Sequence, residues 1–429
     1  MAEDNQKNKC ICMMTDWFPT ASNPYRGVFF KEQAFAMSQT FDFLVLHYTE
    51  SQSGMPFVYF FKKLFHKQYS IEKVKEEKNI IEYNLNIELP VYLQLCDAIH
   101  NFYVKKIKKC EVAGVGKYVS KSYIKAKEKI LRKALENVKQ YNIDLLYCVS
   151  AQTESNTVRC ASKILDKPYV VAEHGPFPWP GTTLKDINYR AIEKADGFLA
   201  ISYDKIRQIL IQGIKLSNIM YVGNLVDEER FSLTKGGEGI KTFIVVAANS
   251  YFKNLSFMIE VFERLIVLSD IPFKLMLVGY AANKGYSKDV KLFEKAILKT
   301  GFSQYVELIP EIPHEQIHEL FERADAFIMT SIQEGMPVSA LEAACCGLPI
   351  FSTKCGGVED FVTEESGRIY NLTDAEGFAW GLLEYLENKI SFQPETIRKE
   401  IVGRFGRDAF IGNMKKAFME AINNYEKVL

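Results

Sequence analysis

The sequence has no excess of charge of either sign, because Lys+Arg and Asp+Glu both number 53 and the formal net charge is zero. A protein whose main partner is nucleic acid needs a clear basic excess to neutralise phosphates. The charge balance therefore excludes nucleic acid as the main partner.

The nine cysteines, an odd number, include no C-x-x-C pair. Several lie in apolar segments, at Cys10, Cys12, Cys148, Cys345 and Cys346. This placement predicts free, buried and reduced thiols, which are typical of a cytosolic protein.

Long apolar runs are also missing, since no stretch approaches the length of a membrane span. The initial segment, MAEDNQKNK, lacks the apolar core of a signal peptide. Apolar residues make up 48% of the chain and charged residues 25%, the balance of a soluble globular protein. We therefore expect a cytoplasmic protein that can touch the inner face of a membrane without crossing it.

Short apolar segments rich in β-forming residues alternate with helical patterns, which predicts an α/β fold with parallel sheets. The first half has six predicted strands, at 10–15, 42–48, 144–149, 168–173, 197–202 and 219–223. The second half has six more, at 242–248, 274–279, 305–309, 326–330, 348–353 and 367–370. Each half suffices for a doubly wound sheet, so we predict two Rossmann-like domains with a ligand cleft between them.

The best domain boundary lies near 225–235, where the charged segment LVDEERFSLTKGGEG breaks both periodicities. The predicted domains are 1–227 and 228–405, followed by an amphipathic helix at 406–429 that packs back on the first domain. An insert at about 55–140 is predicted to be helical and basic. Residues 101–140 hold twelve Lys or Arg and three Asp or Glu. A solvated helix face and a basic, aromatic surface for anionic lipid explain this composition equally well.

Two carboxylates stand out in SIQEGMPVSALEAACCGLPIFST, residues 331–353. Pro337 and Gly347 bracket a predicted helix of small and apolar residues. Glu342 lies inside this apolar run, and Glu334 precedes the helix, in the loop that follows a predicted strand. A buried carboxylate needs good hydrogen bonds, which the two hydroxyls of a ribose can supply. The alternative is that Glu342 caps a neighbouring backbone group or pairs with a lysine.

The pair Glu334-x7-Glu342, with GMPVSAL between and AACCGLPIFSTKCGGVED after it, resembles the E-x7-E signature of retaining glycosyltransferase family 4, which has the GT-B fold. Other segments resemble the family in its own order, and together they are more specific than any one alone. They are WFPTASNPYRGVFFKEQAFAM (17–37), AEHG (172–175), ADGFLAIS (195–202), VGNLVDEERF (222–231), FKNLSFMIEVF (252–262), LMLVG (275–279), ADAFIMTS (324–331) and GGVEDFV (356–362). The insert at 55–140 is not covered.

The resemblance implies that a nucleotide diphosphate sugar binds mostly to the second domain and that the first domain takes the acceptor. The implied catalytic residues are Glu334 beside the donor sugar, His174 at the sugar or acceptor, and Lys253 at the diphosphate. No metal ion or cofactor is expected, because Lys253 would stabilise the leaving group.

The resemblance also implies a wider donor site. Glu342 would hold the ribose hydroxyls, and Gly27 would let the backbone of the first domain approach the phosphates. The other implied donor-binding positions are Asn249, Pro310, Glu311 and Ile312, with Pro310–Ile312 at the base, Gly335 and Met336 at the sugar, and Val338 and Ser339 at the diphosphate.

The sequence departs from the family pattern just before Lys253, where the family usually has an arginine. Here VVAANSYFK offers Ala248 and Asn249 instead. Half of the phosphate clamp is then missing, or it is supplied by Arg26 or Lys354. This departure leaves open whether activity is impaired.

His174 follows the predicted strand 168–173 and precedes GPFPWPG, in which Trp179 is a candidate platform for stacking a sugar. The alternative is a histidine satisfied by loop backbone. Its position at the carboxyl end of a strand favours a role in ligand binding.

The segment HEQIH, residues 314–318, matches the zinc pattern H-E-x-x-H. His314 directly follows Pro313, which puts it at a helix start, and no third ligand follows. In the family that the chain resembles, this segment is an ordinary surface helix. A zinc hydrolase therefore ranks last among the alternatives, and the zinc content of the protein decides it.

The resemblance implies a retaining glycosyltransferase that moves a hexose-type sugar to an acceptor hydroxyl, in the synthesis of a surface polysaccharide or glycolipid. Two alternatives remain. The chain is a binding or scaffold protein that kept the fold and lost turnover, or it is a sugar-nucleotide epimerase. The donor base, the sugar, the acceptor, the linkage and the oligomeric state are not encoded in any recognisable pattern.

The basic insert generates the first testable prediction. Reversing the charges of Lys105, Lys106, Lys108 and Lys109 should weaken binding to vesicles that contain anionic lipid, because juxtaposed lysines are attracted to a negative surface. Sedimentation with such vesicles measures the effect, with neutral vesicles as the control. Unchanged sedimentation would refute the lipid-binding interpretation.

Overall fold

The computed structural model describes residues 8–20, 26–51, 69–77, 79–88, 113–178, 185–234, 239–281, 288–299, 301 and 303–428. The chain divides into two compact units. Unit 1 comprises Met1–Ala200, Gln208–Tyr221 and Asn413–Leu429, and unit 2 comprises Ile201–Arg207 and Val222–Gly412.

The division after Tyr221 lies a few residues before the predicted boundary at 227/228. Backbone contacts explain the difference, because the Val226 amide donates to the Phe405 carbonyl at 2.9 Å. Arg407 also pairs with Asp227 at 3.4 Å. The segment 222–231 is thereby fixed to unit 2, and helix α14 (Arg407–Val428) starts in unit 2 and ends in unit 1.

Unit 1 is built on one sheet, whose strand order among the described residues is β3-β4-β2-β1-β5-β6-β7-β8. Its strands are β1 (Cys10–Thr15), β2 (Asp42–Ser51), β3 (Tyr69–Glu77), β4 (Ile80–Glu88), β5 (Ile143–Cys148), β6 (Tyr169–Ala172), β7 (Gly197–Ala200) and β8 (Ile219–Tyr221). Its helices are α1 (Val28–Met37), α4 (Ala113–Leu135), α5 (Ala151–Leu165), α6 (Lys185–Glu193) and part of α7 (Tyr203–Leu210), with the short 3-10 turn η3 (Glu136–Tyr141). All pairs are parallel except β3 with β4.

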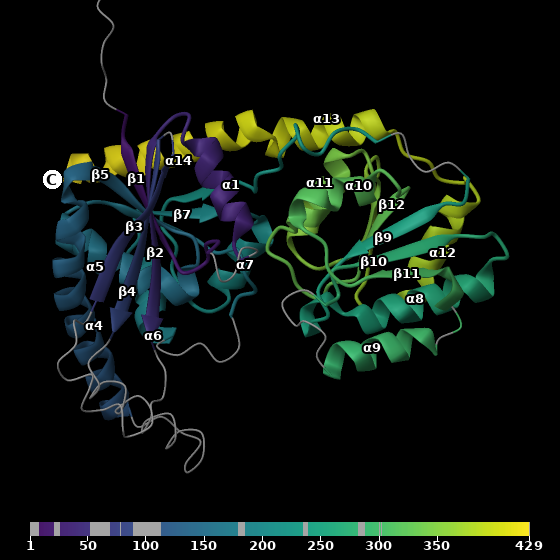
Figure 1. Ribbon diagram of the computed structural model, residues 1–429, viewed down its shortest axis with the longest axis horizontal. Coiled ribbons are helices and arrows are strands. Elements are labelled where there is room, and N and C mark those ends of the chain that lie inside the picture. Colours follow the sequence, from purple (N-terminus) through teal and green to yellow (C-terminus); the bar gives the residue numbers. More distant parts are fainter. Residues whose placement is uncertain are drawn as a thin grey trace, which may run out of the picture. The chain divides into compact units, whose positions relative to one another are not determined.

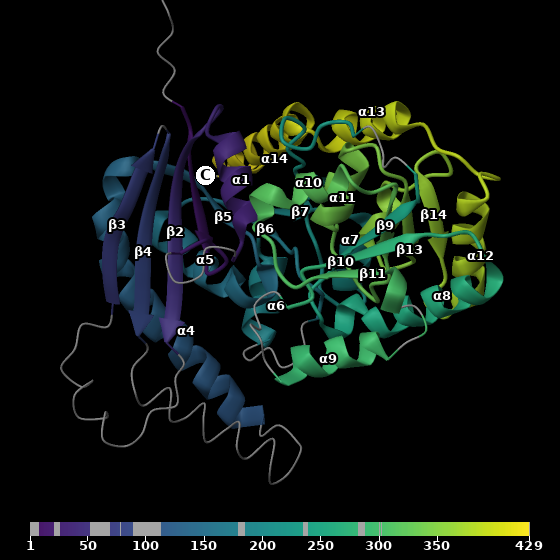
Figure 2. The ribbon, with the colours of Figure 1, turned by 45° about the vertical axis from the view of Figure 1, so that its right-hand side comes forward.

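Helices cover both faces of this sheet (Figures 1 and 2). Right-handed crossovers send α1 to one face, because β2 lies on one side of β1, and send α5 and α6 to the other, because β5–β8 lie on the opposite side. The end of α14 packs on the same unit, where Phe418 contacts the rings of Phe41 and Tyr147. Central strands are therefore buried on both faces, which is why β1 reads as an unbroken apolar run.

The prediction that the insert at about 55–140 is helical was wrong for residues 69–88. These residues form β3 and β4, an antiparallel pair at one edge of the sheet (Figure 2). The segment IEYNLNIE alternates apolar and polar residues, and Tyr83, Leu85 and Ile87 are buried. This alternation is the period of a half-buried strand, and the lysine-rich neighbours concealed it.

Helix α4 supplies the helical part of the insert. The four lysines proposed to meet lipid lie outside the described residues, so their role stays a prediction. Along the described chain, no helix combines the length and the apolar character needed to cross a bilayer. The five cysteines predicted to be buried are free and buried.

Unit 2 has one parallel sheet with the order β11-β10-β9-β12-β13-β14 among the described residues. Its strands are β9 (Thr242–Val246), β10 (Lys274–Val278), β11 (Val306–Ile309), β12 (Ala326–Met329), β13 (Ile350–Thr353) and β14 (Gly367–Tyr370). Its helices are α8 (Leu255–Leu268), α9 (Lys288–Leu298), α10 (Ile317–Phe321), α11 (Val338–Cys345), α12 (Ala375–Leu386) and α13 (Pro394–Phe405). Short 3-10 turns are η4 (Tyr251–Lys253), η5 (Ser303–Tyr305), η6 (His314–Gln316) and η7 (Gly357–Asp360).

A core of buried side chains joins α8, α9 and α12 to one face of this sheet, including Phe243 of β9, Phe262 of α8 and Phe378 of α12. Helices α10, α11 and α13 lie on the opposite face (Figure 1). All twelve strands predicted from the sequence are present, and the two-domain α/β prediction is confirmed.

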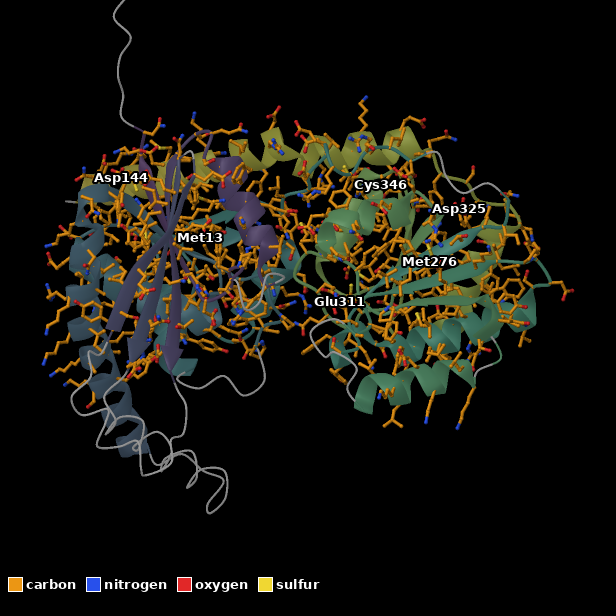
Figure 3. All side chains as sticks on the ribbon, in the orientation of Figure 1. Met13, Asp144, Met276, Glu311, Asp325 and Cys346 are labelled. Carbon is orange, nitrogen blue, oxygen red and sulfur yellow. The ribbon has the colours of Figure 1, made fainter. Side chains whose placement is uncertain are left out.

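The sheet of unit 2 reverses its strand order between β9 and β12. Chain connections leave these adjacent strands in opposite directions, so their carboxyl ends open a gap where ligands of such folds bind. Figure 3 marks the two ends of the sheet, with Glu311 after β11 at the carboxyl ends and Asp325 before β12 at the amino ends. Functional side chains are therefore expected in the loops after β9 and β12.

The corresponding position in unit 1 lies between β1 and β5, and it holds a buried acid. Glu154 of α5 is 1% exposed and accepts hydrogen bonds from the Asp16 amide at 2.7 Å and the Thr15 hydroxyl at 3.1 Å. Burial raises the pKa of Glu154 well above its usual range, and the neighbouring Asp16 carboxyl raises it further.

Replacing Glu154 with glutamine should remove a pH-dependent loss in the free energy of unfolding. The unfolded chain releases this proton near the ordinary glutamate pKa of about 4.3, whereas the folded chain holds it to higher pH. Wild-type stability therefore falls relative to Glu154→Gln as the pH rises through this window, and levels off above the folded pKa. Urea unfolding between about pH 4 and pH 8 measures the difference.

The exposed Glu319 provides the control, since Glu319→Gln should track the wild type at each pH. A difference between Glu154→Gln and the wild type that does not grow with pH would show that Glu154 is ionised in the folded protein.

Candidate functional site

An ion pair occupies the point in unit 2 where the strand order reverses. Lys253 ends the turn η4 after β9, and Glu334 lies in the loop after β12. The Lys253 Nζ atom is 2.7 Å from Glu334 Oε1, and the two side chains are 28% and 14% exposed. The structure therefore brings together two of the three residues predicted to be catalytic.

Backbone contacts hold the loops that carry this pair. The Ile332 amide donates to the Phe252 carbonyl at 2.7 Å, and the Thr330 hydroxyl donates to the Lys253 carbonyl at 3.2 Å. These contacts join the loops after β9 and β12. The distance between Lys253 and Glu334 is therefore set by the backbone as well as by side-chain rotamers.

The loop after β13 also contacts the loop that carries Glu334. The Glu334 amide donates to the Cys355 carbonyl at 2.7 Å. A Cβ on Gly357 would lie 2.0 Å from the Gly335 carbonyl oxygen, so only glycine fits there. Glu359 accepts from the Gly356 amide at 2.7 Å and closes the turn η7. The glycine pair of KCGGVED is explained by this close approach.

Cys355 is a poor nucleophile in this setting. Burial raises the pKa of its thiol well above the usual range, and the carboxylates of Glu334 and Glu359 raise it further. The reactive form of cysteine is the thiolate, so this side chain stays a neutral packing group.

Helix α11 begins at Val338, directly after Pro337, which is its N-cap in an extended conformation. The first amides of a helix have no acceptor within the helix, and the helix dipole favours negative charge there. Ser339 is half-buried at this start, and buried Asn224 fixes the preceding loop by donating to the Met336 carbonyl at 3.4 Å. The predicted diphosphate contacts thus lie at a start of the kind that binds anions.

Glu342 lies one turn further along α11 and is buried, with its side chain 4% exposed. Its Oε1 atom is 2.7 Å from the Nε2 atom of His314, whose side chain is 23% exposed. The other ring nitrogen of His314, Nδ1, is 3.3 Å from Nη1 of Arg230. Glu342 therefore does not point into a sealed apolar interior, and a histidine is among its partners.

The predicted base-binding loop, Pro310–Ile312, follows β11 at the carboxyl ends of the strands (Figure 3). It lies just before His314 in the chain. Asn249 lies after β9, and its amide donates to the Tyr280 carbonyl at 3.0 Å. The predicted donor-binding residues of unit 2 all lie in the loops or the helix start at this one edge of its sheet.

Two predicted residues, Gly27 and His174, lie in unit 1 and are described within it. Gly27 is the N-cap of α1 with a φ of 67°, and a Cβ there would lie 2.4 Å from the Trp17 carbonyl oxygen. The His174 ring contacts Phe30 of α1 edge-on, with ring centroids 4.8 Å apart. The first turn of α1 and the loop after β6 are therefore packed together.

The two residues considered as replacements for the missing arginine differ in setting. Arg26 pairs with Asp16 at 3.0 Å and lies over the Trp17 ring in unit 1. Lys354 is exposed and follows β13 in unit 2. Lys354 thus lies in the same unit as Glu334, whereas Trp179 lies outside the described residues.

The zinc interpretation of HEQIH finds no support in these contacts. His314 directs its two nitrogens at Glu342 and Arg230, and His318 Nδ1 is 2.9 Å from the Glu315 carbonyl. Across the described ranges, no group of three or more His, Cys, Asp or Glu side chains is arranged to hold a metal ion.

Sequence reasoning missed the residues that support the site. His314 meets Glu342 and Arg230 meets His314, from positions far apart in the chain, and no local pattern encodes these contacts. Buried Glu173, next to His174, accepts from the amides of Gln152 at 3.0 Å and Gly175 at 2.8 Å. An acid at the end of a buried strand was a usable signal for this last residue.

Comparison with known proteins finds a matching family model and related proteins. Residues 226–401 match the family model described as "Glycosyl transferases group 1". The lipopolysaccharide 1,6-galactosyltransferase of Escherichia coli is 24% identical over 296 residues, which cover 67% of this chain and 77% of that protein.

Solved structures show the same fold. Sucrose-phosphate synthase from Thermosynechococcus elongatus superposes with a TM-score of 0.67 at 12% identity, covering 97% of this chain and 100% of that one. Anabaena HepE, solved in complex with UDP, has a TM-score of 0.62 at 15% identity, covering 95% of this chain and 98% of that one. The predicted GT-B fold is confirmed.

The contact between Gly357 and Gly335 generates a stability prediction. Gly357→Ala must push the two loops apart, and we expect the free energy of unfolding to fall by about 1–3 kcal/mol. Gly403→Ala is the matched control, because a Cβ there meets nothing within 4 Å on helix α13. Alanine is the better helix former, so the control should be neutral or more stable. Equal urea midpoints for the two variants would contradict this close approach.

Proposed function

We propose that the chain, which has the GT-B fold and matches the model of group 1 glycosyltransferases over residues 226–401, moves a sugar from a nucleotide diphosphate sugar to an acceptor hydroxyl with retention of anomeric configuration. The observation that carries the proposal is the ion pair of Lys253 and Glu334, at 2.7 Å, where the strand order of unit 2 reverses. A cation and a carboxylate there match a ligand that carries both phosphates and sugar hydroxyls.

In this proposal the diphosphate lies between Lys253 and the start of α11. Negative charge grows on the leaving phosphate as its bond to the sugar breaks, and both features stabilise that charge. The proposal assigns this role to protein groups rather than to a metal ion, so chelation with EDTA should leave transfer unchanged. The complex of Anabaena HepE with UDP supports a nucleotide diphosphate as the ligand class.

The reaction we propose takes place on one face of the sugar. The bond from the anomeric carbon to the phosphate oxygen breaks, and the acceptor oxygen bonds to the same carbon from the same side. The acceptor proton passes to the departing phosphate oxygen. Glu334 accepts hydrogen bonds from the sugar and stabilises positive charge on its ring, so no side chain needs to act as a strong base.

Other predicted residues complete the proposed site. Glu342 holds the ribose hydroxyls, the loop Pro310–Ile312 lies against the base, and the amides of Gly335 and Met336 meet the sugar. We assign the choice of acceptor to unit 1, in which Gly27 and His174 lie.

We further propose that the acceptor is a glycolipid or a lipid-linked intermediate of a surface polysaccharide, and that the protein works in the cytoplasm at the inner face of the membrane. The relative named lipopolysaccharide 1,6-galactosyltransferase supports this acceptor class. The basic composition of the insert supports contact with anionic lipid.

A catalytically weak binding protein is the second candidate, and the missing arginine before Lys253 favours it. A sugar-nucleotide epimerase is the third. Product analysis separates the three, because a transferase makes a new glycoside only when acceptor is present, an epimerase changes the donor without acceptor, and a binding protein consumes nothing.

Glu334→Ala should separate catalysis from binding. We expect transfer to fall by at least about 100-fold, because an interaction at the reacting sugar is strongest in the transition state. Nucleotide diphosphate binding should change by less than about 3-fold, since Glu334 meets the sugar and not the phosphates. Transfer is measured with labelled nucleotide sugars, and binding by thermal shift across the same panel.

The exposed Glu365 supplies the control, and Glu365→Ala should keep wild-type transfer. Wild-type protein that binds nucleotide sugars but consumes none would favour the binding protein. Full transfer by Glu334→Ala would remove this residue from the proposed mechanism.

A further inference from the structure

The contacts of His314 restrict where its ring carries a proton. Arg230 Nη1 lies 3.3 Å from His314 Nδ1, and Glu342 Oε1 lies 2.7 Å from His314 Nε2. A guanidinium can only donate hydrogen bonds, and it stays charged at any pH of interest. His314 Nδ1 must therefore accept, which means that it carries no proton.

The tautomer follows from this restriction. A neutral imidazole has a proton on one nitrogen only, so His314 carries it on Nε2. Nε2 then donates to Glu342 Oε1, and the carboxylate remains the only anion in the group of three. Arg230 is in turn placed by Asp227, whose Oδ2 atom lies 3.8 Å from its Nη2 atom.

We propose that His314 is a positioning residue for nucleotide binding: it occupies Glu342 Oε1 and thereby directs the other oxygen of this carboxylate at the ribose of the donor. The inference rests on the proposed function, in which Glu342 holds the ribose hydroxyls. It adds that Arg230 fixes the tautomer of His314, and that the proton on His314 Nε2 then orients the Glu342 carboxylate.

In this proposal the two oxygens of the Glu342 carboxylate bind different partners. A single carboxylate oxygen that is already hydrogen-bonded cannot rotate toward the ligand without breaking that bond, so the second oxygen is oriented before the ligand arrives. Orientation in advance lowers the cost of ordering a side chain on binding. Glu342 is buried, and the hydrogen bond from His314 Nε2 offsets part of the cost of burying its charge.

Two variants separate positioning from packing. His314→Phe keeps an aromatic ring, which in the wild type lies 6.1 Å from the Phe231 ring, but loses both nitrogens. His314→Gln keeps an N–H donor near the position of Nε2 and loses the ring. If His314 positions Glu342, His314→Gln should keep the preference for the ribose hydroxyls and His314→Phe should lose it. If His314 only packs as a ring, His314→Phe should keep the preference and His314→Gln should lose it.

The probe is uridine diphosphate compared with its 2′,3′-dideoxy analogue, with both dissociation constants measured by calorimetry. In the wild type, loss of the hydroxyls should weaken binding by at least about 10-fold, or about 1.4 kcal/mol. In His314→Phe we expect this ratio to fall to about 2 to 3, because the misdirected carboxylate no longer distinguishes the ligands. In His314→Gln the ratio should return to within about 3-fold of the wild type.

The outcomes distinguish failure of the inference about His314 from failure of the proposed function. If the wild type distinguishes the ligands and folded His314→Phe distinguishes them equally well, the inference about His314 fails while the ribose role of Glu342 stands. If the wild type binds both ligands equally, the ribose role of Glu342 fails and the inference fails with it. If it binds neither, the comparison is repeated with the diphosphates of adenosine, guanosine and thymidine, and failure to bind any of them refutes the proposed function. If His314→Phe does not fold, a His314→Gln ratio near 1 with an unchanged melting temperature would overturn the inference.

Discussion

The contact on which the site depends is the salt bridge of Lys253 and Glu334 at the reversal of strand order in unit 2. It lies at the carboxyl ends of β9 and β12, where the chain connections of the two strands leave in opposite directions and open a gap at the edge of the sheet. Its formation requires three loops to meet, and their main chains are bonded to one another. A charged pair this well oriented by its surroundings is ready for a ligand at little further ordering cost.

The second acid of the site depends on a different kind of support. Glu342 lies in a helix of small residues whose packing brings its carboxylate under the loop that carries His314. An acid at such a position is stable only with strong donors nearby. The side chain that we propose to bind the ribose of the donor is thus held by a histidine in the protein without ligand.

How much the sequence could predict depends on the range of each interaction. The strand at 10–15 was predictable because burial on both faces leaves a continuous apolar run. Glu334 and Glu342 were recognisable because their spacing is local. The strand at 80–88 was predictable in principle from its alternation, but the lysines around it favoured a helical interpretation. The contacts of His314 with Glu342 and with Arg230 could not be predicted, because they depend on how whole elements pack and leave no periodic pattern in the sequence.

The outer strand of the unit 1 sheet has a further consequence. Lys73 and Lys75 of β3 pair with Glu76 and Glu77 along an exposed edge. Another chain that added a strand at this edge would have to strip water from these charges while aligning its own backbone with them. The charged pairs along β3 therefore oppose the addition of a strand from another molecule at these residues.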